Sequence, residues 1–78
     1  MSKGYSVAFI NEVNSADRSK IGVLFGTACI KKDIPVSDVA TFFDVSRMTV
    51  YSWFRGKTNV PQKHQEKMQK LVDKLMIK

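Results

Sequence analysis

Apolar side chains recur along this chain at the spacing of an α-helix, in two long stretches that enclose a shorter one. The first stretch runs from Ala16 to about Lys32. Its apolar residues stand at positions i, i+3, i+4, i+7 and i+8: Ile21, Leu24, Phe25, Ala28 and Cys29. The last stretch, from Pro61 to about Ile77, has the same interval: Met68, Leu71, Val72, Leu75 and Met76. With the shorter segments between and before them, they predict an all-α fold of four to five short helices.

Residues 36–56 predict two short helices joined by a tight turn. Apolar residues mark one face of each helix: Val39, Ala40 and Phe43 on the first, then Val50, Trp53 and Phe54 on the second. The small Ala40 allows the helices to cross closely, and Val45 can fill the turn between them. Ser46 is suited to cap the second helix, and Gly56 supplies the left-handed position that ends it. This is the pattern of a helix-turn-helix.

The outward face of the second helix is polar, basic and aromatic. With Val50 pointing inward and about 100° of rotation per residue, the outward residues are Met48, Tyr51, Ser52 and Arg55, flanked by Arg47 and Thr49. None of them is acidic, whereas solvated helix faces usually mix both signs of charge. Such a face suits the major groove of DNA. An ordinary solvated helix face is the alternative interpretation.

Residues 16–75 resemble the helix-turn-helix domain of the lambda-repressor-like, or Cro/repressor-type, family of DNA-binding proteins. The resemblance is carried by Val39-Ala40, Val45-Ser46, Thr49-Val50, Trp53, Arg55-Gly56-Lys57 and Pro61. Three places depart from the family pattern: Asp44 replaces the usual turn glycine, Pro35-Val36 replace a capping Ser or Thr and a Gln, and Phe54 replaces a common Glu. Asp tolerates the left-handed backbone, Ser37 can take over part of the phosphate contact, and Phe54 indicates extra core or an interface.

Two sets of DNA contacts are expected from this surface and from the resemblance. Base readout is expected from Arg47, Met48, Thr49, Tyr51 and Ser52, and family members touch base edges at the positions of Arg47, Met48 and Ser52. Arg47 can grip a guanine through two hydrogen bonds, and Met48 can rest on a thymine methyl group. Phosphate contacts are expected from Ser37, Arg55, Lys57, Thr58, Asn59 and Lys63, because the family lays the corresponding loop and helix start along the DNA backbone. An ordinary polar loop is the alternative for residues 57–59.

The organisation of the rest of the chain leaves two alternatives open. Gly22 and Gly26 lie one turn apart on the first long helix, where they indicate either a close crossing by a neighbouring helix or a dimer contact. Residues 1–14 form either a short extra helix or an arm that pairs with a second subunit, and residues 15–78 form the helix-turn-helix domain. The predicted core comprises Leu24, Phe25, Ala40, Phe43, Val45, Val50, Trp53 and Leu71.

The charge distribution indicates a polyanionic partner. The net charge of the 78 residues is +6, and residues 31–78 hold ten Lys and Arg against five Asp and Glu, a net charge of +5. Positive charge that clusters around and after the helix-turn-helix favours nucleic acid, through release of counterions. Charge alone is weak support, because many small domains are basic for solubility.

The residue types argue against an enzyme or a metal protein. A single cysteine, Cys29, excludes an internal disulfide, and Cys29 with the single His64 gives too few ligands for a metal site. No carboxylate pair has an apolar setting, so neither catalysis nor a cofactor or small-molecule ligand is expected. No run approaches the roughly 20 apolar residues of a membrane helix and no signal peptide is evident, so a cytoplasmic protein without a membrane partner is expected.

These features predict a sequence-specific regulator of transcription that binds the major groove of double-stranded DNA, as a phage-type repressor acting as a homodimer on a palindrome. The alternative is a module that binds and inhibits a protein partner through Phe42, Phe54, Tyr51 and the apolar N-terminal segment. Salt discriminates between the two functions, because phosphate contacts weaken steeply as salt rises and an apolar protein interface does not.

Overall fold

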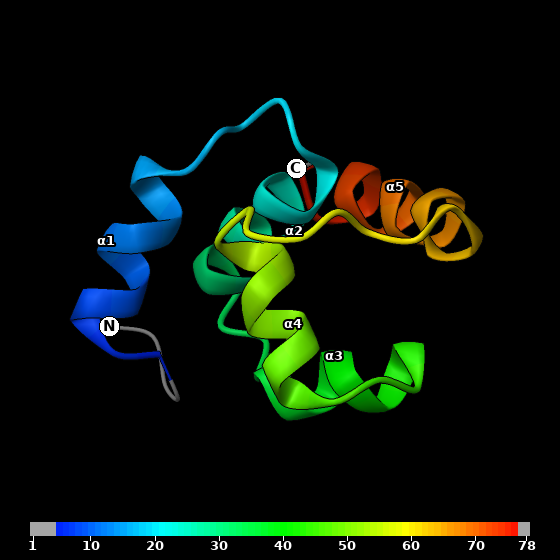
Figure 1. The fold of residues 1–78 in the computed structure, drawn as a ribbon, viewed down its shortest axis with the longest axis horizontal. Coiled ribbons are helices and arrows are strands. Elements are labelled where there is room, and N and C mark those ends of the chain that lie inside the picture. Colours follow the sequence, from blue (N-terminus) through cyan, green and yellow to red (C-terminus); the bar gives the residue numbers. More distant parts are fainter. Residues whose placement is uncertain (1–4, 77–78) are drawn as a thin grey trace.

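The computed structural model describes residues 5–76 and shows five helices and no strand within them (Figure 1). The helices are α1 (Val7–Ser15), α2 (Ile21–Lys31), α3 (Val36–Phe43), α4 (Arg47–Phe54) and α5 (Gln62–Met76). The all-α prediction is therefore confirmed. The predicted end of the last helix at Ile77 lies outside the described residues.

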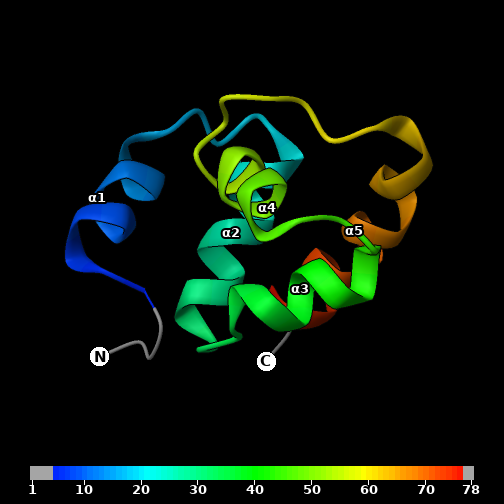
Figure 2. The ribbon, with the colours of Figure 1, turned by 60° about the horizontal axis from the view of Figure 1, so that its bottom comes forward.

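Helix α2 lies at the centre and packs against α1, α4 and α5, while α3 pairs with α4 (Figures 1 and 2). Aromatic rings join these layers edge to face. The ring of Phe25 on α2 meets Phe43 on α3 at 5.9 Å and Phe54 on α4 at 5.8 Å, and Phe43 meets Trp53 at 5.8 Å between centroids. Such edge-to-face pairs contribute about 0.5–1.5 kcal/mol beyond the area they bury. The helix pair α3–α4 is thereby fixed to the rest of the molecule.

The predicted core residues all contact one cluster, although they differ in burial. Phe25, Ala40, Phe43, Val50 and Trp53 are buried. The other three predicted core residues, Leu24, Val45 and Leu71, are half-buried at its edge. Phe54, which the sequence left as core or interface, is fully buried core.

Gly22 and Gly26 let α2 and α4 approach closely within one chain. A Cβ atom on Gly22 would lie 2.7 Å from the carbonyl oxygen of Trp53, and one on Gly26 would lie 2.7 Å from Cγ of Phe54. Contacts this short leave no room for a methyl group. The two glycines therefore serve a helix crossing inside the chain, which was the first of the two interpretations.

The first long helix begins later than predicted. It starts at Ile21 instead of Ala16, and Asn14 and Ser15 belong to the end of α1. The reason is local: the carboxylate of Asp17 accepts hydrogen bonds from the backbone N–H of Ser19 at 2.9 Å and from its hydroxyl at 2.7 Å. Such bonds compete with helix formation and hold a turn, and they also lower the pKa of Asp17.

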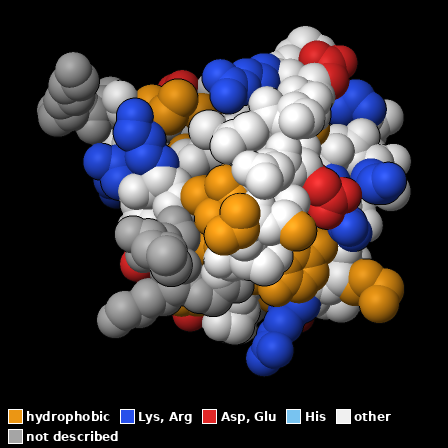
Figure 3. Space-filling model, turned by 90° about the vertical axis from the view of Figure 1, so that its left-hand side faces the viewer, with side chains coloured by type: hydrophobic (Ala, Val, Ile, Leu, Met, Phe, Trp, Pro, Cys, Tyr) orange, Lys and Arg blue, Asp and Glu red, His pale blue; other side chains and the backbone are white. Residues whose placement is uncertain are grey.

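Residues 5–15 pack against the rest of the chain. Ser6 caps α1 by accepting a hydrogen bond from the N–H of Phe9 at 3.1 Å, and Tyr5, Phe9 and Val13 are buried in the common core. The hydroxyl of Tyr5 donates to the carbonyl of Ile34, far along the chain. Figure 3, which looks at the α1 side, shows hydrophobic side chains that stay at the surface among Lys and Arg. The expected boundary between residues 14 and 15 falls inside α1, whose core is shared with the rest of the chain.

None of the helices within residues 5–76 combines the length and the apolar character that crossing a bilayer requires.

Candidate functional site

The turn between α3 and α4 is built by three residues, each with a defined role. Asp44 adopts the left-handed conformation, with φ of 56°. The N–H of Val45 then donates to the carbonyl of Ala40 at 3.0 Å, which closes the end of α3. The hydroxyl oxygen of Ser46 accepts a hydrogen bond from the N–H of Thr49 at 3.1 Å and caps α4. The start of α4 is therefore fixed in direction and position.

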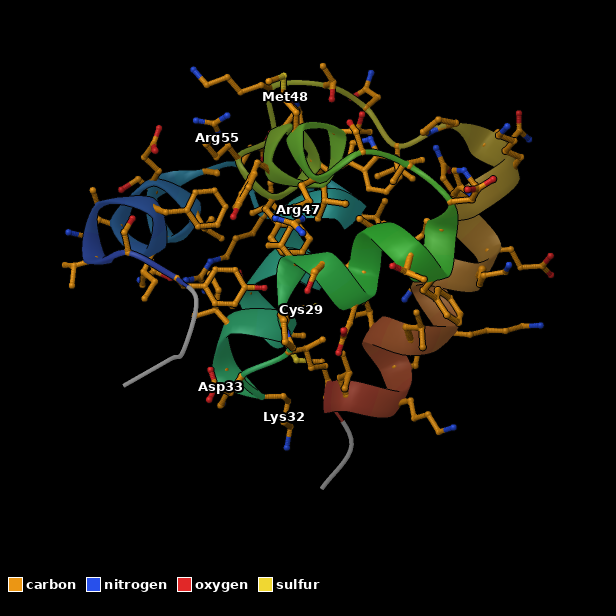
Figure 4. The ribbon with its side chains drawn as sticks, turned by 90° about the horizontal axis from the view of Figure 1, so that it is seen from below. Cys29, Lys32, Asp33, Arg47, Met48 and Arg55 are labelled. Carbon is orange, nitrogen blue, oxygen red and sulfur yellow. The ribbon has the colours of Figure 1, made fainter. Side chains whose placement is uncertain are left out.

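The first turn of α4 projects its side chains into solvent. Arg47 is exposed, and Met48, at 77% exposure, is the most exposed large hydrophobic residue described. Thr49 and Ser52 are half-exposed beside them. In Figure 4 Met48 lies at one edge of the molecule and Arg47 points toward the viewer from the start of the helix. A basic and an apolar side chain are thus offered from a helix whose opposite face is held by Val50 and Trp53 in the core.

The second half of the outward face is covered by α1, which the sequence did not predict. The ring of Tyr51 meets Phe9 of α1 edge to face at 5.0 Å. The guanidinium carbon of Arg55 lies 6.0 Å from the centre of the Phe9 ring, and a guanidinium nitrogen lies 3.9 Å from the carboxylate of Glu12. Both Tyr51 and Arg55 are half-buried. The rotation of 100° per residue places them outward correctly, but only tertiary packing decides whether an outward residue meets solvent or another helix.

The loop after α4 is fixed at both ends and presents three polar side chains between them. Gly56 adopts φ of 72°, and its carbonyl accepts a hydrogen bond from Nζ of Lys20 at 2.9 Å. At the other end Val60 is buried, and its carbonyl accepts a hydrogen bond from the side chain of Gln65 at 2.9 Å. The side chains between these anchors are exposed: Lys57, Thr58 and Asn59. The loop crosses the molecule from α4 to α5 (Figure 1).

The two remaining predicted phosphate contacts lie in different places. Lys63, exposed in the first turn of α5, lines a surface hollow of about 410 Å³ together with Thr49 of α4. Ser37 is exposed in the first turn of α3, at the far end of that helix from the turn at 44–46. The structure therefore brings Lys63 and Thr49 together, but Ser37 does not line that hollow.

His64 also lines this hollow. Its ring is half-buried and meets Phe43 at 5.4 Å and Trp53 at 5.9 Å. The sequence feature that could have predicted the partial burial of His64 is its spacing. His64 lies one turn before the buried Met68, on the same side of α5.

Two titratable side chains with shifted pKa values, Cys29 and Tyr5, are buried in the core. Burial raises the pKa of the Cys29 thiol to about 12, and burial together with nearby negative charge raises the pKa of Tyr5. Within residues 5–76, no three His, Cys, Asp or Glu residues come close enough to hold a metal ion. Comparisons of the chain with models of protein families, with curated proteins and with solved structures found no match.

Proposed function

We propose that this chain is a sequence-specific double-stranded DNA-binding protein, with α3 and α4 as a helix-turn-helix of the lambda-repressor-like type. The observation that carries the proposal is the first turn of α4, where a capped helix start offers Arg47 and Met48 to solvent without a nearby acidic residue on that helix. The major groove is about 12 Å wide and accepts an α-helix. In helix-turn-helix proteins the N-terminal residues of the second helix contact the bases.

The exposed residues of α4 have the chemistry for direct readout. Arg47 donates two hydrogen bonds to O6 and N7 of a guanine, and Met48 contacts a thymine methyl group. Thr49 and Ser52 offer hydroxyl groups beside them. The ring of Tyr51 packs against Phe9, so we assign Tyr51 to the edge of the surface that contacts DNA. Its main role there is to position α4 against α1.

Phosphate binding is assigned first to the rigid loop at residues 57–59. Lys57, Thr58 and Asn59 supply one cationic and two neutral donors on a loop whose two ends are anchored. Such contacts to phosphate position the duplex without reading its sequence. Lys63 extends this contact to the start of α5. Ser37 and Arg55 are further candidates, and a guanidinium nitrogen of Arg55 lies 3.9 Å from the carboxylate of Glu12.

A two-fold dimer and a palindromic site complete the proposal. One short helix reads only a few base pairs, and two copies a helical turn apart supply the affinity and specificity that a regulator needs. The role that fits a small basic domain of this kind is repression of transcription, in the cytoplasm, without a cofactor. Of the three aromatic residues named for the competing protein-binding module, Phe54 is fully buried and Tyr51 is covered by α1, so only Phe42 stays exposed.

The test is a binding selection from a randomised duplex library, carried out at low and at moderate salt and sequenced after several rounds. We expect an enriched palindrome, whose half-site spacing gives the geometry of the dimer. Enrichment of a single half-site would support sequence-specific DNA binding and contradict the proposed dimer. No enrichment at either salt concentration would overturn the proposal.

A further inference from the structure

An apolar groove lies between α3 and α5, and none of its lining residues is among those assigned to DNA. Its walls are Val39 and Phe42 of α3 and Leu71 and Leu75 of α5, and its floor is Phe25 of α2. The volume is about 180 Å³ and the exposed lining is apolar. In Figure 4, α3 is drawn between α4, where Met48 lies, and the C-terminal half of α5.

Phe42 stands at the rim of this groove as a fixed and exposed aromatic wall. It is 52% exposed, although its ring meets Phe43 edge to face at 5.1 Å. The ammonium group of Lys67 lies 5.2 Å from the centre of the same ring, which holds the ring by a cation–π contact. The exposed part of the Phe42 ring and the apolar groove beside it are surface that a binding partner can bury. Burying this apolar surface would stabilise the complex.

The α5 side of the groove is bordered by positive charge. Lys67 and Lys74 lie four residues before and three residues after Leu71, so they neighbour it on the helix surface, and Lys70 extends the same edge. All three side chains are exposed. Among the residues that line the groove only Asp38 is acidic. We call Lys67, Lys70 and Lys74 the basic edge.

We propose that this groove is a docking site for an acidic amphipathic helix of a partner protein. Apolar side chains of that helix, spaced one turn apart, would fill the groove between Phe42 and Leu71, and its acidic side chains would face the basic edge. The groove has room for one or two such side chains, as expected for a helix anchored at a few positions.

Charge decides between this occupant and a second copy of the chain. A two-fold interface at this groove would gather the basic edges of two copies into one contact, where Asp38 is the only acidic residue of the groove lining. Positive charges gathered in one interface repel one another and disfavour this pairing. A partner of the opposite sign gains from the same three lysines. The lining of the groove includes no residue of α4.

The experiment is a selection with the full chain as bait against a displayed library of randomised helical peptides of about 15 residues, roughly four turns. We expect the enriched peptides to carry apolar residues one turn apart and a net negative charge. On isotope-labelled full chain, titration with an enriched peptide should shift the backbone amide signals of Phe42, Leu71 and Leu75 most strongly. Enriched peptides that are basic, or that shift signals elsewhere, would overturn the proposal, and so would a library without enrichment.

Two variants separate the apolar and the ionic parts of the site. Phe42→Ala should weaken the selected peptide about tenfold or more. The double variant Lys67→Glu with Lys74→Glu should weaken it by a similar factor, whereas Lys31→Glu, an exposed lysine at the end of α2, should have little effect. Each variant is first shown to unfold cooperatively. If the free chain dimerises in sedimentation and Phe42→Ala abolishes the dimer, the groove belongs to a second copy and the proposal is wrong.

Discussion

Single side chains of α4 divide between those that face solvent and those that hold the helix in place. Val50 and Trp53 are buried, and Ser46 caps the helix start. Arg47 and Met48 make none of these structural contacts. A change at Arg47 therefore reports on function without a large effect on folding.

Arg47→Ala should weaken specific DNA binding by about 1–3 kcal/mol and relax the preference at one base pair, because a bidentate contact to guanine is lost. The measurement is a titration of the selected operator and of its single-base variants. Lys32→Ala is the matched control, since Lys32 is also exposed but lies at the opposite edge of the molecule from Met48 (Figure 4). A sequence preference that Arg47→Ala leaves unchanged would rule out the assigned role.

Cys29 gives the stability of the protein a pH dependence on the alkaline side. Burial raises its pKa from 9.0 to about 12, so the folded state keeps a proton that the unfolded state loses above pH 9. The unfolded state then binds fewer protons, and the free energy of unfolding falls by about 1.4 kcal/mol per pH unit in this range. Below pH 9 the contribution is fully present. The measurement is the urea midpoint between about pH 7 and pH 10.5.

Cys29→Ala is the control for this effect, and its midpoint should fall less steeply above pH 9 than that of the unchanged chain. Burial of Tyr5 makes stability fall with pH in the same direction, but this fall begins at a higher pH because the ordinary pKa of tyrosine is higher. Tyr5 is present in both proteins, so its effect is common to both profiles. Parallel pH profiles for the two proteins would show that the Cys29 thiol does not carry the dependence.

At the scale of the helices, the crossing of α2 and α4 depends on the absence of a side chain at Gly26. Gly26→Ala would ordinarily gain about 1 kcal/mol in a helix interior. Here the new methyl group would meet the side chain of Phe54 at 2.7 Å and its Cα at 3.1 Å, so we expect a net loss of about 1–3 kcal/mol. Urea unfolding followed by the fluorescence of Trp53, the single tryptophan, measures it.

Thr41→Ala, on the exposed face of α3, is the matched control and should be neutral or slightly stabilising. A stabilised Gly26→Ala protein would mean that α2 and α4 do not cross as closely as described.

Helix α1 is the second element whose contribution can be isolated. Phe9 joins it to α4, with its ring 5.0 Å from Tyr51, 6.4 Å from Phe54 and 5.9 Å from Tyr5 within the N-terminal segment. Phe9→Ala should lower the free energy of unfolding by about 3 kcal/mol, because it leaves a cavity where α1 and α4 meet. Val7→Ala, on the same helix but at a site 66% exposed, should change it little. Equal, small effects would show that α1 is not held by Phe9.

At the scale of the whole molecule, we expect the proposed binding to DNA to depend on salt, because the chain has a net charge of +6. Each phosphate contact adds about 0.9 to the slope of log K against log salt. Lys57→Ala should therefore weaken binding to all sequences alike and reduce that slope by about 0.9, whereas Lys31→Ala should leave it unchanged. A loss confined to one base pair would instead place Lys57 among the base-reading residues.

Much of the site was predictable because its conformation is set within a few residues. Asp44 and Gly56 take left-handed backbone, and Ser46 caps α4 through Thr49, three residues on. The apolar intervals that predicted the helices are also local. The predicted start of α2 was wrong for a local reason as well. The turn held by Asp17 competes with helix formation before Ile21.

The sequence by itself determined the helices, the turn between α3 and α4, and the basic character of the surface, because propensity, capping and charge belong to each residue and its near neighbours. The tertiary structure alone decided that α1 covers Tyr51 and Arg55, that His64 lies against Trp53, and that Phe42 borders a groove. Those contacts join residues distant along the chain, as the bond from Tyr5 to Ile34 does. Helical periodicity gives the direction of a side chain, and only the packing of the whole chain determines what that side chain meets.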